Sequence, residues 1–359
     1  MAGIPVSACI IAKNEERHIE NCLKSLLRYD MELIVVDTGS SDSTKKLAER
    51  YTDKVYDFAW TDDFSAARNF AASKASNNWI FVLDCDEQVQ DMDIGKLRIC
   101  MQKYPKCVGV LGIMNVYQNN AKEIIRTDEI PRFYNKNYYE YKFRIHEQIT
   151  PAKAERYDEI LLETFPVPAK VKHYGYDISK EEMNEKQGRN LKLLRRSLGE
   201  YEGMDDYVYF QMGQSYKILQ EYEQAVEAYD MCLEVNRNPE KRFLPLCLEA
   251  YTECLMKIGN VNDAYRLLDM NKEYLKTTKL KYLFGKAADI CCDKENAVRY
   301  LTSITDAADL DKLEDDAFDA FARIFALYKE AGETEKLEEY KNKLVEYGKQ
   351  HGKQIVFPA

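Results

Sequence analysis

The stretch at residues 79–89, WIFVLDCDEQV, constrains the fold of this chain more than any other. Its first five residues form a continuous apolar run, which is typical of a strand buried on both faces in a mainly parallel sheet. The run ends in three carboxylates within four residues, Asp84, Asp86 and Glu87. Their mutual repulsion makes full ionisation costly unless a cation lies among them. Because oxygen ligands at such a strand end suit Mg²⁺ or Mn²⁺, the stretch predicts a divalent-metal site.

A solvated acidic turn would explain the same carboxylates without any ligand, since short acidic motifs occur often by chance. The preceding sequence supplies the context for the metal interpretation. Strand-type and helix-type segments alternate there, at 6–12, 16–29, 33–36, 44–51, 55–58, 64–75 and 79–83. This alternation with short connections predicts a parallel sheet covered by helices on both faces. The carboxyl ends of its strands then deliver their polar residues to one edge.

Composition limits the classes of protein that need to be considered. With 359 residues the chain has room for about two domains, and its net charge of −10 disfavours nucleic acid as a main partner. No apolar stretch reaches the roughly 20 residues of a membrane span, and the first residues lack the basic leader of a secretory signal. Ten cysteines without a Cys-x-x-Cys pair indicate reduced thiols. We therefore expect a cytoplasmic protein.

Three residues at the predicted sheet edge are candidates for substrate contacts. Asp37 directly follows an apolar strand, where a carboxylate accepts hydrogen bonds from a ribose or a base; a turn-capping role is the alternative. Arg68 and Asn69 lie in a predicted helix within reach of the same edge. The forked guanidinium of Arg68 suits a diphosphate, and a surface ion pair with Asp62 or Asp63 is its alternative. Because the chain has no Gly-x-Gly-x-x-Gly or Walker-type loop, dehydrogenase and P-loop NTPase interpretations lose their main support.

Four motifs occur in order along this half of the chain: KNEE at 13–16, VVDTGSSDST at 35–44, DDFSAARN at 62–69 and LDCDE at 83–87. In this order and spacing they resemble the family 2 glycosyltransferases of GT-A fold. More narrowly, they are similar to a bacterial branch that joins this α/β domain to tetratricopeptide-like helical repeats and includes peptide S-glycosyltransferases. The resemblance covers about the first 175 residues. It implies a nucleotide-diphosphate sugar, a UDP-sugar, as the donor.

The resemblance also implies roles for individual residues. Asp37 would lie near the uracil or ribose, and Asp84 and Asp86 would be the metal-binding Asp-x-Asp, with Mn²⁺ or Mg²⁺ as the cofactor. The predicted substrate-binding residues are Lys13, Asn14, Glu15, Asp37, Arg68, Asn69, Asp84 and Arg132. Processive members of the family carry a Glu-Asp pair and a Gln-x-x-Arg-Trp motif after the metal site. Neither is present here, so no polysaccharide-synthase activity is implied.

Sugar transfer with inversion needs a base that takes the acceptor proton. Glu147 is our first choice for this base, and His146 is the second because imidazole titrates near neutral pH. Asp128 and Glu129 stay open as further candidates.

His173 belongs to a His-x-Gly step near the end of the predicted domain. We expect it to be a metal ligand beside Asp84 and Asp86, or a pyrophosphate contact. A hydrogen-bonded structural role is the alternative for each of these histidines.

From residue 177 onward the pattern is helical, beginning with a capping box at Ser179 and Glu182. Residues at tetratricopeptide spacings follow, best at 209–232, more weakly at 255–268 and 284–301, and as a degenerate copy or cap at 324–340. An irregular helical bundle is the alternative. The predicted domains are thus 1–176 (GT-A), 177–204 (linking helix) and 205–359 (repeats).

Repeat domains of this kind are more often binding surfaces than catalysts. We expect the repeats to hold an acceptor peptide or protein, or to form a homodimer. The favoured function is a metal-dependent glycosyltransferase. Its alternatives are a sugar nucleotidyltransferase and a repeat adaptor that carries an inactive GT-A domain.

Overall fold

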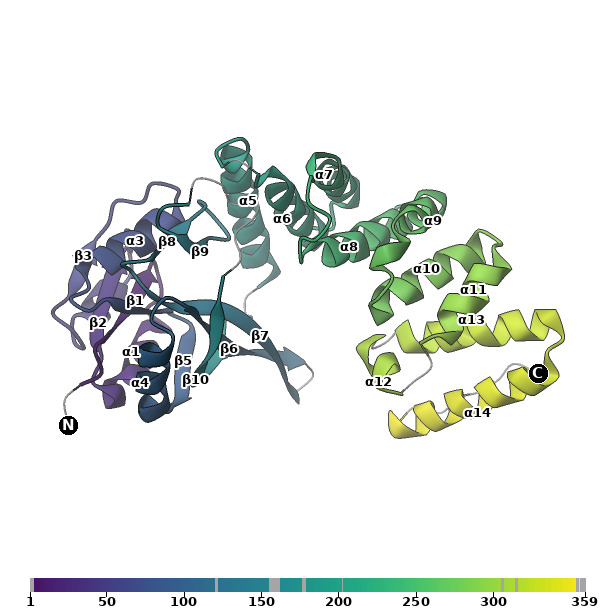
Figure 1. Ribbon diagram of the computed structural model, residues 1–359, viewed down its shortest axis with the longest axis horizontal. Coiled ribbons are helices and arrows are strands. Elements are labelled where there is room, and N and C mark those ends of the chain that lie inside the picture. Colours follow the sequence, from purple (N-terminus) through teal and green to yellow (C-terminus); the bar gives the residue numbers. More distant parts are fainter. Residues whose placement is uncertain are drawn as a thin grey trace. The chain divides into compact units, whose positions relative to one another are not determined.

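The computed structural model describes residues 3–119, 122–154, 162–175, 179–201, 203–304, 307–313, 316–352 and 355. The chain divides into two compact units, Met1–Asp205 and Asp206–Ala359 (Figure 1), and each is described by itself. The predicted boundary at 176–177 lies outside the described residues, and the predicted domain limits stay a prediction. None of the described helices has the length and apolarity that crossing a membrane requires.

An eight-stranded sheet with the order β3-β2-β1-β4-β7-β6-β10-β5 forms the centre of the first unit. The first four strands of this order are parallel, as predicted: β1 (Val6–Ala12), β2 (Glu32–Asp37), β3 (Val55–Asp57) and β4 (Trp79–Leu83). The other half is mixed and consists of β5 (Glu87–Met92), β6 (Val108–Asn119), β7 (Lys122–Asn135) and β10 (Thr164–His173).

Strand β7 pairs with β4 on one side and with β6 on the other and is antiparallel to both. Strand β10 is parallel to β6 and antiparallel to β5. The predicted parallel sheet is therefore only half of the observed one. Strand–helix alternation implies parallel neighbours, but it carries no information about strands that are inserted later along the chain.

Helices cover both faces of the sheet, as predicted (Figure 1). Helices α1 (Ile19–Leu26), α2 (Thr44–Ala48) and α4 (Ile94–Lys103) share one core with alternate residues of β1, such as Ala8 and Ile10. Helix α3 (Phe64–Lys74) packs in a second core. The 3₁₀ turn η1 (Leu27–Tyr29) extends α1. These buried strands fix where the chain leaves the sheet at its carboxyl edge.

The helix predicted at 16–29 begins later, at Ile19. The Glu16 N–H donates to Asp42 Oδ2 (3.2 Å), and Glu16 Oε2 accepts from the Ser43 N–H (3.0 Å). Residue 16 is thus bound to the loop after β2, which prevents the first turn predicted there.

Three further elements complete this unit. Strands β8 (Tyr139–Lys142) and β9 (Gln148–Pro151) pair as a small antiparallel sheet. Helix α5 (Lys180–Ser197) starts with the capping box predicted at Ser179 and Glu182.

The second unit consists of helical pairs at the predicted repeats. The pairs are α6 (Asp205–Ile218) with α7 (Tyr222–Val235), α8 (Leu244–Lys257) with α9 (Val261–Met270), α10 (Thr278–Ile290) with α11 (Lys294–Thr302), and α13 (Asp316–Ala331) with α14 (Thr334–Gln350). Short helical turns lie between them: η2 (Lys272–Tyr274), α12 (Ala307–Leu310) and η3 (Asp311–Leu313).

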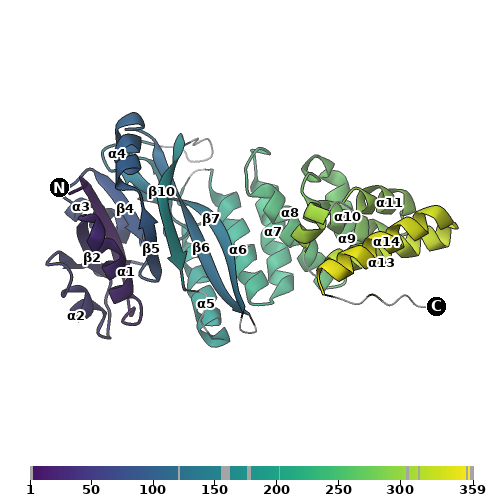
Figure 2. The same cartoon turned by 90° about the horizontal axis from the view of Figure 1, so that it is seen from below.

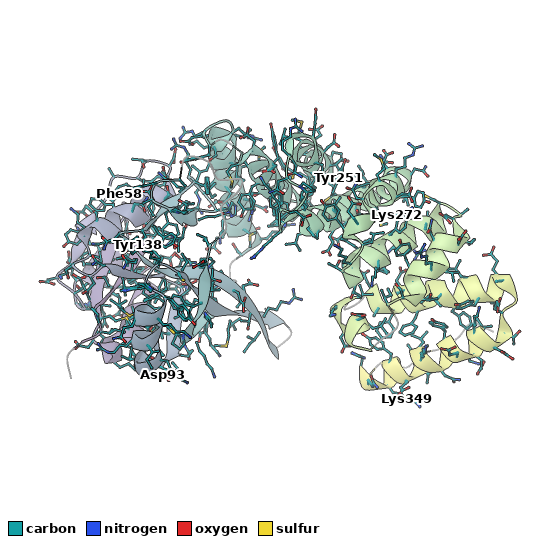
Figure 3. The ribbon with its side chains drawn as sticks, in the orientation of Figure 1. Phe58, Asp93, Tyr138, Tyr251, Lys272 and Lys349 are labelled. Atoms are coloured by element: carbon teal, nitrogen blue, oxygen red, sulfur yellow. The ribbon has the colours of Figure 1, made fainter. Side chains whose placement is uncertain are left out.

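Buried contacts join these helices within and between the pairs. Tyr251 of α8, labelled in Figure 3, donates its hydroxyl hydrogen to Asp230 Oδ1 of α7 (3.2 Å). Gly213 of α6 faces the ring of Tyr229, and a Cβ at Gly213 would lie 2.4 Å from Tyr229 Cε1. The small residue therefore sets how closely α6 and α7 approach.

We predict that Gly213→Ala destabilises the protein, because the added methyl group overlaps the fully buried Tyr229 ring. Overpacking of this kind costs about 1–3 kcal/mol of unfolding free energy. Denaturant unfolding followed by circular dichroism measures this change.

Gly188→Ala in α5 is the matched control, since no atom lies within 4 Å of its added Cβ. It should stabilise its helix by about 0.5–1 kcal/mol. Equal effects of the two substitutions would contradict a steric role for Gly213.

Candidate active site

The turn between β4 and β5 holds the three predicted carboxylates. Glu87 is 2% exposed, and its Oε2 accepts a hydrogen bond from the Asp84 N–H (2.9 Å), while the Glu87 N–H donates to the Asp84 carbonyl (3.1 Å). Burial and the neighbouring Asp84 raise the pKa of Glu87 to about 7, against the opposing effect of Arg132. Glu87 therefore closes the turn from inside.

Two buried arginines hold Asp84. Arg68 Nη2 donates to Asp84 Oδ1 (2.8 Å), and Arg132 Nη2 donates to Asp84 Oδ2 (2.6 Å). Burial opposes ionisation of Asp84, but Arg132 and Arg68 outweigh it and hold its pKa well below its usual range. Arg132 also reaches Glu87 Oε1 (3.4 Å), and Arg68 Nε donates to Glu147 Oε1 (2.6 Å). Asp84 is thus permanently charged and held on both oxygens.

Arg68 accordingly forms buried ion pairs with Asp84 and Glu147 and not the surface pair with Asp62 or Asp63. Arg68 Nη1 and Arg132 Nε are buried and have no hydrogen-bond acceptor among the described residues. Arg68 therefore keeps the two hydrogens of Nη1, and Arg132 the single hydrogen of Nε, for a further acceptor.

Asp86 faces His173, with Oδ2 3.2 Å from Nε2. Burial lowers the pKa of His173, and the hydrogen bond and charge of Asp86 outweigh this effect, so the net shift is upward. Gly175 lies directly against this pair: a Cβ there would be 2.0 Å from Asp86 Oδ2 and 2.5 Å from His173 Nε2. Only a glycine leaves room beside the two side chains.

The donor set fits a divalent ion that is shared with a substrate. In the part of the chain that the structure describes, no group of three or more His, Cys, Asp and Glu side chains is arranged to hold a metal. One carboxylate and one imidazole remain, Asp86 and His173, because both oxygens of Asp84 already accept from arginines. Mg²⁺ and ions like it are commonly held by one or two protein ligands, with water and substrate phosphates completing the shell.

The loops after β1 and β2 bind each other. Asn14 Oδ1 accepts from the Ser41 N–H (2.8 Å), and the Glu15 N–H donates to Thr44 Oγ1 (2.7 Å). Burial and the carboxylates of Asp86 and Asp84 raise the pKa of Glu15 to about 7. The KNEE loop therefore lies near the acidic turn, and Lys13 is exposed there.

Asp37 caps the turn after β2, which was the alternative role considered for it. Its Oδ2 accepts from the N–H groups of Gly39 (3.1 Å) and Ser40 (3.0 Å), which is a turn-capping role. Its Oδ1 is buried and has no hydrogen-bond donor among the described residues. That oxygen suits a ligand N–H or hydroxyl.

The segment between β8 and β9 brings the two candidate bases to this edge. His146 has a positive φ of 52°, and burial lowers its pKa, so its ring is neutral at pH 7. Glu147 is oriented by Arg68. The charge of Lys186 on α5 acts on both His146 and Glu15, which places α5 beside the same region.

Asn69 is used as a clamp for β8. Its Nδ2 donates to the Tyr141 carbonyl and its Oδ1 accepts from the Tyr141 N–H, both at 2.8 Å. We assign it this structural role, and its contact with substrate stays a prediction.

Asp128 and Glu129, the other candidate bases, lie exposed on β7. Asp128 accepts a hydrogen bond from Asn115, which sequence reasoning did not single out. A polar side chain within the apolar run of β6 was the available signal. Lys186 was also missed as a neighbour of the site, and Gly175 was noted only as part of the His-x-Gly step.

Two family models match the chain: Glycosyl transferase family 2 at residues 7–158 and Tetratricopeptide repeat at residues 207–239. The SPbeta prophage-derived glycosyltransferase SunS of Bacillus subtilis is 23% identical over 309 residues, which cover 85% of this chain and 71% of that protein. The lipopolysaccharide core biosynthesis glycosyltransferase LpsC of Rhizobium meliloti is 33% identical over 90 residues, covering 24% of this chain and 33% of that protein.

A TPR repeat-containing protein of Synechococcus elongatus is 45% identical over 84 residues, 23% of this chain. The chain spans only 21% of the length of that protein. Among solved structures, S. aureus TarS has a TM-score of 0.41 at 14% identity, covering 73% of this chain and 54% of that one. The matches agree with the family predicted from the four motifs: residues 7–158 match the glycosyl transferase family 2 model, and the tetratricopeptide repeat model matches within the helical unit that follows.

Proposed function

We propose that the protein is a metal-dependent glycosyltransferase that moves a sugar from a nucleotide-diphosphate donor, a UDP-sugar, to an acceptor with inversion. The observation that carries the proposal is the Asp86–His173 pair, 3.2 Å apart at the carboxyl edge of the sheet. It stands beside an Asp84 that two buried arginines keep ionised. A domain of this family at residues 7–158 supports it.

Asp86 and His173 would hold Mn²⁺ or Mg²⁺. When bound, such an ion supplies positive charge for the departing diphosphate. Exposed Lys13 adds a mobile cation near the phosphates. The buried Oδ1 of Asp37 supports a hydrogen bond from the uracil or ribose. Asn14 Oδ1 accepts from the Ser41 N–H and so holds the loop after β1 against the loop after β2.

Glu147 remains our first choice for the base. Arg68 Nε donates to Glu147 Oε1 and so holds its carboxylate in one orientation. His146 is neutral at pH 7 because of burial and is the second choice. Transfer needs only one of them to reach the acceptor hydroxyl or thiol.

The helical unit offers a place for a peptide or protein acceptor. A cavity of about 490 Å³ lies between its helices, with apolar walls from Met256, Leu283 and Ile290 and charged walls from Lys217 and Glu253. Mixed linings of this kind suit a peptide, which carries apolar side chains and a polar backbone. A homodimer is the other use that we expected for these repeats.

We predict that Asp86→Asn and His173→Ala each weaken Mn²⁺ binding and lower donor turnover about 10²-fold or more, because lost charge stabilisation is worth several kcal/mol. Titration calorimetry with Mn²⁺ and UDP, together with hydrolysis of a UDP-sugar panel, measures both effects. Asp91→Asn, an exposed carboxylate on β5, is the control and should change neither.

Two results would contradict the proposed function. Unchanged UDP-sugar hydrolysis in Asp86→Asn would contradict the assignment of Asp86 to a metal site. Consumption of a nucleoside triphosphate and a sugar phosphate, with release of pyrophosphate, would identify a nucleotidyltransferase, and absence of any metal-dependent nucleotide binding would indicate an adaptor.

We predict that Glu147→Gln lowers sugar transfer about 10²–10⁴-fold, the usual contribution of a general base, and leaves UDP binding nearly unchanged. The amide keeps an oxygen acceptor for Arg68 Nε but cannot take a proton. Single-turnover transfer and UDP titration separate the two effects.

His146→Gln is the matched comparison from the same turn. A large loss of transfer in His146→Gln with near-normal transfer in Glu147→Gln would assign the base to His146. Equal losses of transfer and of UDP binding in Glu147→Gln would argue against its role as base.

A further inference from the structure

A hydrogen-bond relay crosses neighbouring strands of the sheet and ends at His173. Asn115 Nδ2 on β6 donates to Asp128 Oδ2 on β7 (2.7 Å), and Asn115 Oδ1 lies 2.9 Å from His173 Nδ1 on β10. His173 Nε2 then faces Asp86 Oδ2 (3.2 Å), just before β5. Strands β7, β6, β10 and β5 are consecutive in the sheet (Figure 2), so the relay runs across the strands.

The chemistry of Asp128 gives this relay a direction. A carboxylate only accepts hydrogen bonds, so the Asn115 NH₂ group must face Asp128. The Asn115 carbonyl oxygen then faces His173, and an amide oxygen also only accepts. The hydrogen must therefore come from His173 Nδ1. In the neutral ring the lone pair is then on Nε2, which faces the Asp86 carboxylate at 3.2 Å, so these two acceptors repel each other unless a cation lies between them.

The opposite tautomer satisfies Asp86 but leaves a mismatch at Asn115. With the hydrogen on Nε2, His173 would donate to Asp86, and Nε2 would have no lone pair for a metal. Its Nδ1 would then need a donor, which requires Asn115 to turn its amide and place its oxygen against Asp128. Asn115 is 3% exposed, so water has little access to repair this mismatch.

We propose that Asn115 and Asp128 are positioning residues that hold His173 in its Nδ1–H tautomer and present Nε2 as a ligand beside Asp86. The proposal rests on the proposed function of Asp86 and His173 as a metal site. Metal-binding histidines usually donate their second N–H to a carboxylate or carbonyl, which fixes the ring. Here the exposed Asp128 carboxylate fixes the orientation of the buried Asn115 amide. The amide oxygen in turn accepts the hydrogen of His173 Nδ1.

The relay accounts for the amide side chain of Asn115 within the otherwise apolar run at residues 108–117. It also gives the exposed carboxylate of Asp128 a hydrogen-bond partner. Glu129, the next residue along β7, is exposed and is not part of the relay.

The first experiment reads the tautomer in the metal-free full-length protein. Long-range ¹H–¹⁵N correlation spectra at mildly alkaline pH distinguish the neutral tautomers, and the chain has only four histidines to assign. Because Asp86 competes for a hydrogen on Nε2 in the metal-free protein, we expect both tautomers, with a larger Nδ1–H share in the wild type and in Glu129→Gln than in Asp128→Asn. Asp128→Asn should lower the Nδ1–H share, because the new amide can either accept from or donate to Asn115.

The second experiment measures Mn²⁺ affinity by calorimetry, without turnover. We expect Asn115→Leu to weaken binding about 10–100-fold, the usual effect of losing such a partner, and Asp128→Asn to weaken it less. The exchanged pair Asn115→Asp/Asp128→Asn restores every donor and acceptor, so it should bind like the wild type. Glu129→Gln is the control and should bind normally.

The outcomes separate this inference from the proposed function. An Nδ1–H share that is the same in the wild type and in Asp128→Asn, or unchanged Mn²⁺ affinity in both Asn115→Leu and Asp128→Asn, overturns the relay. A larger Nδ1–H share in a wild type that does not bind Mn²⁺ overturns the metal site and leaves the relay standing. If Asn115→Leu fails to fold, the exchanged pair and Asp128→Asn still decide the question.

Discussion

The ion pairs between two buried arginines and the carboxylates around them are the interaction on which the rest of the site depends. A buried guanidinium is costly unless carboxylates compensate it, and here Asp84, Glu87 and Glu147 do so for Arg68 and Arg132. These residues come from separate elements of the first unit. Loss of one partner would leave an uncompensated buried charge, so the network fixes the turn after β4 before any ligand arrives.

Within this network the three neighbouring carboxylates, Asp84, Asp86 and Glu87, have different roles. Asp84 is held by two arginines, and Glu87 closes the turn. Asp86 faces outward to His173. Repulsion within the acidic motif is thus relieved largely by the protein, which leaves Asp86 for a cation shared with substrate.

The repeats are specified in a different way. Each helical pair depends on local spacing and on small residues such as Gly213 and Gly285, where a Cβ would meet Tyr229 or Leu301. Such contacts join residues that are near in sequence, so the repeats of the second unit can be recognised from the sequence alone. Long-range pairing has no comparable signature, which is why the first unit was harder to predict.

The sequence by itself determined the limits of β1 and β4, helices on both faces of the sheet, the family and the repeats, because burial imposes local periodicity. Only the tertiary structure decided that β7 enters between β4 and β6, and that Arg132 reaches Asp84, 48 positions away. It also paired Asn115 with His173 across 58 positions. Side-chain partners of this kind follow from strand order, and strand order in the mixed half of the sheet is not encoded in any local pattern.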